Sequence, residues 1–103
     1  AAPKMECWRE MMMTRAMENG VYFAPCNKVG LEGEWVFGGR SMIVAPTSEV
    51  LIEAGEDGDE TITASLERDL VFERRRQRPM FRDRRPELYT PICATTEDIP
   101  LVS

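Results

Sequence analysis

The chain has 103 residues, 43% of them hydrophobic, and a formal net charge of −5 at neutral pH, so it holds at most one domain. No apolar run approaches the roughly 20 residues that span a bilayer, and the N-terminus lacks a signal-peptide pattern, so we expect neither a membrane role nor secretion. Three irregularly spaced cysteines and the lack of histidine predict reduced thiols in the cytoplasm and no metal site.

Charge is unevenly distributed along the chain. Residues 1–67 hold 5 Lys/Arg against 12 Asp/Glu, whereas residues 68–85 hold 8 Arg against 3 Asp/Glu. The two parts could pair within one chain or across a dimer, and the overall acidity gives no support to nucleic acid as a partner.

The first predicted element is a helix over residues 3–19. It ends at Gly20, a typical C-cap residue. One apolar stripe recurs along it at three- and four-residue spacing: Met5, Trp8, Met12 and Ala16.

Short strands follow the helix. Residues 22–24 predict a buried strand, and residues 28–37 predict a polar, glycine-rich loop anchored by Trp35 and Phe37. Residues 41–45 and 50–54 are apolar and β-branched, and the turn at residues 46–49 predicts that they pair as a hairpin.

The second half of the chain begins with an acidic segment, residues 55–60, predicted to be a solvated loop. Residues 61–66 predict a last strand, and residues 67–77 predict a helix that Pro79 ends. Residues 79–103 hold four of the seven prolines and predict an extended tail. Strands with helices on one side only leave the other sheet face bare, so a covering layer is implied.

Three phrases carry a family resemblance: RAMENGVYFAPCNKVG at residues 15–30, FGGRSMIVAPTSEVL at 37–51 and FRDRRPELY at 81–89. Together they resemble the C-terminal half of the carbon–nitrogen hydrolase (nitrilase) superfamily, whose members cleave amide, carbamoyl and nitrile C–N bonds. Within it, the phrases look most like N-carbamoylputrescine amidases and N-carbamoyl-D-amino acid hydrolases. The resemblance covers about residues 8–91.

The resemblance implies a fold class, α/β with layered elements. Residues 1–78 would be the C-terminal half of an αββα nitrilase-type sandwich, and residues 79–103 would be an extended tail. The missing N-terminal half would cover the bare sheet face, and homo-oligomers are expected.

The chemistry implied by the resemblance uses a Glu–Lys–Cys triad and no cofactor. All three members are expected before Ala1, so we predict no catalytic residue in this chain and no activity from it alone. The expected substrate is a small amide or carbamoyl compound. Two alternatives remain: a non-catalytic module that binds an acidic partner through its arginine-rich segment, and a pseudo-enzyme subunit completed by another chain.

A second Cys/Lys/Glu set, Cys26, Lys28 and Glu32, lies within this chain. We interpret Cys26 as a small buried side chain at a strand end, because nucleophilic thiols need a base assembled from distant segments.

Other residues are predicted to bind or to position. Asn27 either satisfies backbone groups at a strand end or lies at the rim of the substrate pocket, beside which the resemblance places Gly39 and Ser41. Ser48 replaces the usual glycine of the family turn and costs about 1 kcal/mol if that position needs a positive φ. The tail is expected to reach across a subunit boundary through Arg82, Arg84, Arg85 and Tyr89.

Overall fold

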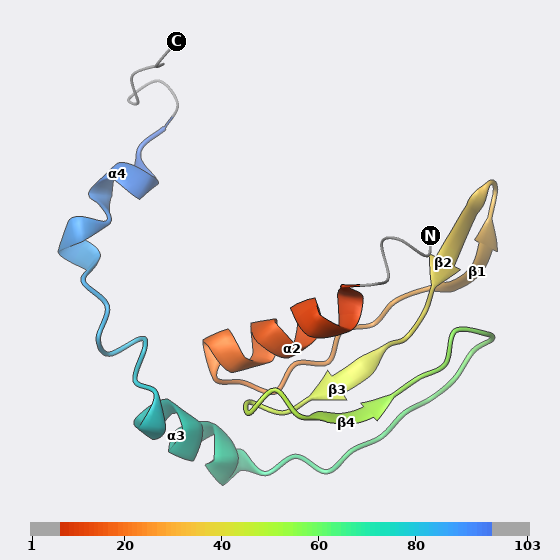
Figure 1. The fold of residues 1–103 in the computed structure, drawn as a ribbon, viewed down its shortest axis with the longest axis horizontal. Coiled ribbons are helices and arrows are strands. Elements are labelled where there is room, and N and C mark those ends of the chain that lie inside the picture. The colour runs from red at the N-terminus through yellow and green to blue at the C-terminus, as the bar shows by residue number, and fades with distance from the viewer. Residues whose placement is uncertain (1–6, 96–103) are drawn as a thin grey trace.

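The computed structural model of the chain describes residues 7–95, and Figure 1 shows the elements in space. In chain order they are α2 (Trp8–Asn19), β1 (Val29–Glu32), β2 (Trp35–Gly38), β3 (Met42–Val44), β4 (Val50–Glu53), α3 (Arg68–Gln77), a 3-10 helix η1 (Pro86–Leu88) and α4 (Thr90–Cys93). The mixed helix and strand content confirms the α/β class.

The molecule is flat and open. Its principal extents are 47 × 43 × 17 Å, and its radius of gyration is 18.3 Å, against about 13 Å for a compact chain of this length. Within residues 7–95, one helix, α2, covers one face of the β3–β4 hairpin.

Helix α2 confirms the predicted C-terminus. Gly20 has a φ of 60° in the left-handed region, and its amide bonds to the carbonyls of Ala16 and Met17, which is the glycine cap that the sequence indicated. The predicted start at Pro3 and the apolar Met5 lie outside the described residues.

A small core lies between α2 and the hairpin of β3 and β4. The two strands pair antiparallel, as predicted, with an irregular register after Ile43. The side chains that meet α2 are buried, whereas Ile43, which points to the opposite face because strand side chains alternate, is only half-buried. The buried hydrophobic cluster consists of Met12, Ala16, Met42 and Val44.

The predicted loop over residues 28–37 is instead a second hairpin. β1 and β2 pair antiparallel from Val29↔Gly38 to Glu32↔Trp35. Gly33, the first of the two turn residues, has a φ of 63°, the backbone that a two-residue hairpin turn needs there. The prediction was wrong because Gly33 and Glu34, which form a hairpin turn, were interpreted only as part of a polar loop.

Residues 22–24 do not form the predicted buried strand. Only Phe23 pairs, in an isolated bridge to Val44, and its side chain is half-buried. The chain stays beside β3 after Phe23, since the Pro25 carbonyl accepts from the Met42 amide at 3.1 Å. A regular ladder does not continue there because Pro25 has no N–H to donate.

Residues 55–60 form the exposed loop that the acidic composition predicted. The strand predicted over residues 61–66 is absent. Its alternating pattern suits a strand, but no neighbouring strand pairs with it in the part of the chain that the structure describes. A strand needs such a partner to satisfy its backbone groups.

Helix α3 confirms the helix predicted after residue 66, and Glu67 is its extended N-cap residue. The tail beyond it is not simply extended, as expected, since η1 and α4 each form about one turn. Pro86 begins η1 and Pro91 lies in the first turn of α4, where a proline's missing N–H is no loss.

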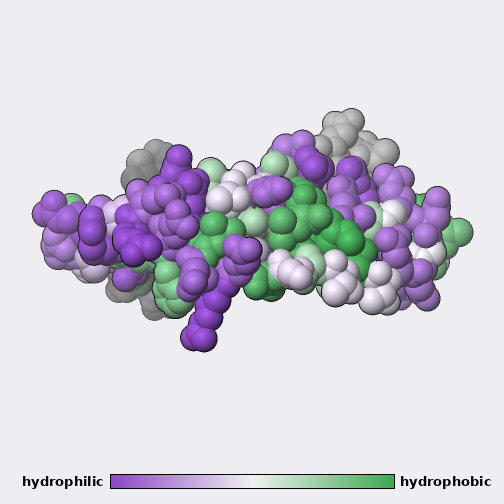
Figure 2. All heavy atoms as spheres, turned by 90° about the horizontal axis from the view of Figure 1, so that it is seen from below, coloured by the Kyte–Doolittle hydropathy of each residue, from purple (hydrophilic) through white to green (hydrophobic). Residues whose placement is uncertain are grey.

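Many large hydrophobic side chains stay exposed. Figure 2 shows hydrophobic side chains gathered in the middle of one face, with hydrophilic ones at both ends. No helix among residues 7–95 is long and apolar enough to cross a membrane. From β4 onward, the exposed large hydrophobic residues are Leu51, Leu66, Phe72, Met80, Phe81, Leu88, Tyr89 and Ile92.

Candidate functional site

The structure brings Asn27, Gly39 and Ser41 together, all three named from the sequence. The amide of Asn27 donates to the Ser41 hydroxyl at 2.7 Å, and that hydroxyl is 3.2 Å from the Asn27 carbonyl oxygen. The Asn27 side chain donates from Nδ2 to the Gly39 carbonyl at 2.9 Å, and its Oδ1 accepts from the Lys28 amide. These bonds fasten the chain after residue 26 to the start of β3.

Gly39 is required by this geometry. It is buried, and its φ is 65°. A Cβ atom there would lie 2.5 Å from a methyl group of Val29 and 2.9 Å from the Gly55 carbonyl oxygen. Any side chain would therefore force β1 and the 55–60 loop away from β3.

Arg40 has a φ of 62°, which is unusual for a residue with a side chain. Its backbone is held on both sides: its amide donates to the Gly55 carbonyl at 3.1 Å, and its carbonyl accepts from the indole of Trp8 at 3.1 Å. A strained conformation persists where the surroundings fix it in this way.

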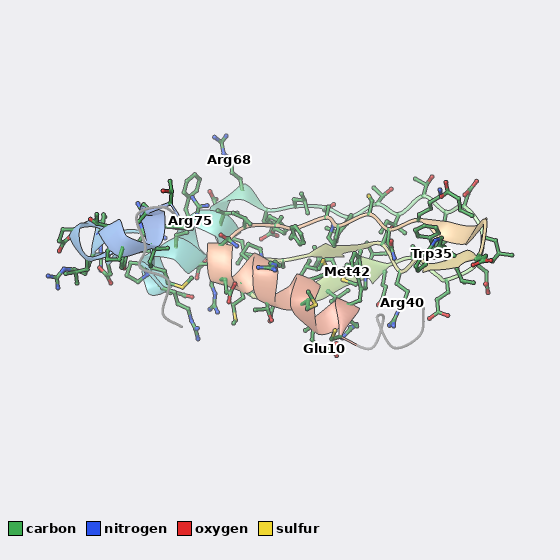
Figure 3. The ribbon with its side chains drawn as sticks, turned by 90° about the horizontal axis from the view of Figure 1, so that it is seen from above. Glu10, Trp35, Arg40, Met42, Arg68 and Arg75 are labelled. Carbon is green, nitrogen blue, oxygen red and sulfur yellow. The ribbon has the colours of Figure 1, made fainter. Side chains whose placement is uncertain are left out.

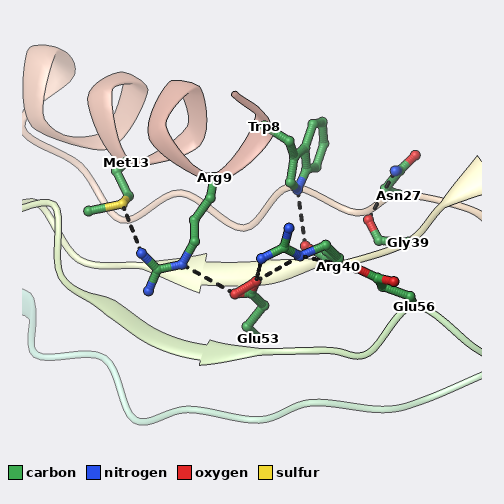
Figure 4. A network of polar contacts seen from close by, with 8 residues as sticks. All are labelled: Trp8, Arg9, Met13, Asn27, Gly39, Arg40, Glu53 and Glu56. Atoms are coloured by element: carbon green, nitrogen blue, oxygen red, sulfur yellow. Dashed lines mark hydrogen bonds and ion pairs between the residues drawn. The ribbon is translucent and has the colours of Figure 1, made fainter. Parts of the chain in front are cut away.

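The Arg40 guanidinium belongs to an ion-pair network drawn in Figure 4. Its Nε and Nη2 donate to Glu53 Oε1 at 3.2 and 3.0 Å, and Arg9 Nε donates to Glu53 Oε2 at 3.4 Å. Glu56 lies 3.9 Å from Arg40 Nε. The half-buried Glu53 carboxylate thus links α2, the start of β3 and β4.

A cavity of about 320 Å³ opens beside this network. Its lining offers an amide, a hydroxyl, two cations and two carboxylates, which suit a small polar molecule. Among the described residues that line it there is no cysteine. The lining residues are Asn27, Lys28, Val29, Arg40, Ser41, Ala54, Gly55, Gly58, Asp59 and Glu60.

The local Cys/Lys/Glu set does not form a catalytic group. Lys28 pairs with Glu32 through its Nζ, and the Cys26 thiol points to the Ala24 carbonyl at 4.0 Å. Our interpretation of a buried Cys26 was wrong, because the side chain is exposed: residue 26 follows an isolated bridge and no continuous strand.

The tail residues named from the sequence make local contacts. Arg82 pairs with Asp83 at 3.0 Å and Arg85 with Glu87 at 2.6 Å, and the amide of Arg85 donates to the Tyr89 hydroxyl at 3.1 Å.

One further hydrogen bond and one shifted pKa belong to this part of the tail. Arg84 Nε donates to the Phe81 carbonyl at 3.1 Å. The hydrogen bond from Arg85, followed by one from its own backbone, lowers the pKa of Glu87 below its ordinary value of 4.5.

Sequence reasoning missed the arginine–glutamate network. Arg40 lies between Gly39 and Ser41, which the sequence analysis named, but its partner Glu53 lies 13 positions away. Predicting the ion pair between them requires the register of β3 against β4, which cannot be predicted from a local sequence pattern. Asp59 and Glu60 were taken only as solvated acids, because their approach to the cavity depends on how the loop folds back.

The comparison with known families now bears on this site. The family model described as carbon–nitrogen hydrolase matches residues 2–76, well over half of the chain. The chain belongs to the carbon–nitrogen hydrolase family. This membership confirms the superfamily resemblance and does not favour the alternative of a non-catalytic interaction module.

Named relatives of this family agree. The chain is 32% identical over 87 residues to a 2-oxoglutaramate amidase of Bacillus subtilis, covering 84% of this chain and 33% of that protein. It is 32% identical over 90 residues to an N-carbamoylputrescine amidase of Arabidopsis thaliana, covering 80% and 30%. The chain therefore spans about a third of the length of these curated relatives.

A solved carbon–nitrogen hydrolase from Helicobacter pylori G27 has the same fold over this region. The TM-score is 0.79 at 27% identity, covering 90% of this chain and 34% of that chain.

Proposed function

We propose that this chain is the C-terminal part of a hydrolase that cleaves a linear amide or N-carbamoyl bond through a thiol acyl-enzyme. The observation that carries the proposal is the family match over residues 2–76. Relatives named as amidases of 2-oxoglutaramate and N-carbamoylputrescine support a small amide or carbamoyl substrate.

The proposed chemistry needs three residues that we expect before Ala1. A cysteine thiolate attacks the carbonyl carbon, a lysine stabilises the oxyanion, and a glutamic acid gives its proton to the leaving nitrogen. The C–N bond breaks and a thioester remains. Water, deprotonated by the same glutamate, then cleaves the thioester and regenerates the thiol.

The hairpin of β3 and β4 is covered by α2 on one face only, which supports the proposal that another layer covers the second face. Met42 and Val44 are buried under α2, while Ile43 on the other face is half-buried and Leu51 is 37% exposed. A sheet of a layered domain needs both faces covered. We propose that the N-terminal half of an αββα sandwich supplies the second cover.

The role proposed for this chain is to form part of the pocket wall. Asn27 and Ser41 line the 320 Å³ cavity, and Gly39 accepts the Asn27 side chain. We place these three residues at the pocket rim. The tail with Arg82, Arg84, Arg85 and Tyr89 is proposed to contact a second subunit, and the exposed, unpaired cysteines suit the reducing cytoplasm.

The first test is the reading frame upstream of Ala1. Segments carrying Glu, Lys and Cys, in that order, are expected there. The whole product should release ammonia from ω-amides or from N-carbamoyl amines, whereas the 103-residue chain alone should not. An upstream sequence without the three segments, or turnover by the chain alone that Cys26→Ala abolishes, would contradict the proposal.

The second test concerns the rim. In the whole enzyme, Asn27→Ala removes the side-chain hydrogen bonds with Gly39 and Lys28 that hold the proposed rim in place. A displaced rim should lower kcat/KM about fivefold or more, which corresponds to about 1 kcal/mol. Asn19→Ala is the matched control, since Asn19 is exposed and bonds only to its own helix. Equal kcat/KM values in the two variants would contradict the proposed place of Asn27 at the pocket rim.

A further inference from the structure

The tip of the β1–β2 hairpin carries an exposed apolar group. Leu31 is 76% exposed, Trp35 68% and Val36 57%. Leu31 pairs across the hairpin with Val36, and Trp35 with Glu32, so aliphatic and aromatic side chains share the tip with acidic ones. Exposed tryptophan among aliphatic neighbours is typical of an interface anchor.

A groove of about 330 Å³ lies where α3 passes into the tail. Its apolar floor contains Met80 and Phe81, and the guanidinium carbons of Arg75 and Arg84 lie 5.6 and 5.9 Å from the Phe81 ring centre. Arg75, Arg76, Arg78 and Arg82 line the groove. It therefore combines an aromatic floor with a strongly positive rim.

We propose that the hairpin tip of one copy of this chain inserts Trp35 into the arginine-lined groove of a second copy. Tryptophan is the aromatic side chain that binds guanidinium groups best. Glu34 precedes it at the tip, so an acidic group would meet the basic rim of the groove. An apolar cavity of about 150 Å³ holds a benzene molecule, so the groove has room for an indole.

The occupant is a second copy because the two surfaces cannot meet within one chain. In Figure 3, Trp35 lies near the right end of the molecule, whereas Arg75 lies on α3, left of centre. The long extents of the molecule are 47 and 43 Å. Two copies lying antiparallel place each hairpin at the other's groove. That arrangement is a closed pair with two identical contacts.

This inference rests on the self-association part of the proposed function and not on its chemistry. The chain's molar mass is measured by sedimentation equilibrium over a concentration series, with far-UV circular dichroism to confirm that each variant is folded. A monomer–dimer equilibrium is expected that weakens as salt rises, because charges contribute. A chain that stays monomeric at every concentration overturns the inference and leaves the hydrolase proposal to its own assay.

Trp35→Ala should weaken the dimer by about 30-fold, as expected for a central aromatic anchor. Ile92→Ala is the matched control, because Ile92 is 82% exposed but belongs to neither surface; it should leave the dissociation constant unchanged. Equal effects of the two variants overturn the inference, since the dimer would then use another surface.

Charge reversal makes the test independent of hairpin stability. Glu34→Arg and Arg78→Glu should each weaken the dimer, and the double variant should recover part of the loss because the ion pair is restored with opposite sign. Mixing Trp35→Ala chains with Arg76→Glu/Arg78→Glu chains should yield heterodimers, since such a pair keeps one intact hairpin and one intact groove. Additive losses in the double variant and no heterodimer in the mixture contradict the proposed contact.

Discussion

The segment from α2 to β4 and the segment after residue 60 follow the same local rules but differ in burial. Every buried residue among residues 7–95 lies between Met12 and Pro46. After residue 60 no described residue is buried, although α3 is a regular helix of 10 residues. The first segment brings a helix face onto a hairpin, while the second packs only partly against the described chain, leaving Leu70, Val71 and Arg74 half-buried.

Local structure and burial therefore have separate causes in this chain. Helix α3 is rich in arginine. Arg74, Arg75 and Arg76 lie in its last turn, where positive charges interact favourably with the helix dipole and stabilise the helix. It meets the body mainly at its ends, where the Glu67 amide donates to the Tyr22 hydroxyl at 2.9 Å and Arg75 lies beside Gly20. Its Phe72 stays 56% exposed.

The sharpest test of this comparison removes one large side chain from each segment. Met42→Ala should lower the free energy of unfolding by about 2 kcal/mol, the low end for such a core truncation, since Met42 is 1% exposed. Phe72→Ala should change it by less than about 0.5 kcal/mol. Urea unfolding measures both, and a Phe72→Ala loss as large as that of Met42→Ala would show that α3 shares the core.

A second prediction concerns the Glu53 carboxylate within the first segment. Glu53→Ala leaves Arg9 and Arg40 without their acceptor and should cost about 1.5 kcal/mol, since charged hydrogen bonds are broken in a half-buried site. Glu32→Ala, which breaks the exposed pair with Lys28, should cost under about 0.5 kcal/mol. Both free energies come from the same urea titration. Equal losses would mean that the network contributes no more than a surface pair.

A third prediction tests the turn between β3 and β4. Ser48 has a φ of 72°, so Ser48→Gly should raise the free energy of unfolding by about 1 kcal/mol as the left-handed strain is relieved. Ser65→Gly, in the unpaired segment after the acidic loop, should not stabilise the chain. Thermal or urea unfolding compares the two, and a destabilising Ser48→Gly would refute the strain.

The smallest expected effect lies in the tail. The pKa of Glu87 is lowered in the folded chain, so its contact with Arg85 stabilises the tail above pH 4.5 and is lost as pH falls through the lowered pKa. In Arg85→Ala the pKa should rise toward 4.5, which NMR titration of the Glu87 carboxyl carbon measures. Arg84→Ala, whose guanidinium bonds to Phe81, is the control and should leave the pKa lowered.

Elements with a complete local signal could be predicted from the sequence. Gly20 ends α2, the turn at residues 46–49 joins β3 to β4, and Pro79 follows α3, because each of these residues restricts its own backbone. For Ser48, the glycine usual at that position of the family turn raised the question of a positive φ, and the structure shows one of 72°. The family, too, could be predicted, since its three phrases lie in continuous runs of sequence.

The errors share a different cause. Residues 61–66 alternate in side-chain character as a strand does but lack a pairing strand among the described residues. Residues 28–37 form a hairpin, although their polar composition indicated a loop. Cys26 is exposed because the strand expected before it shrinks to a single bridge. In each case the outcome depends on a neighbouring segment, which the residues themselves do not encode.

For the candidate site, the sequence alone determined which residue types are present and that Asn27, Gly39 and Ser41 belong to one family pattern. The packing of the folded chain established that Asn27 bonds to both of the others, that Glu53 binds two arginines, and that a polar cavity lies beside them. Those contacts join segments 12 to 44 residues apart. Hydrogen bonds and ion pairs act over a few ångströms, so they exist only once packing has brought such distant segments together.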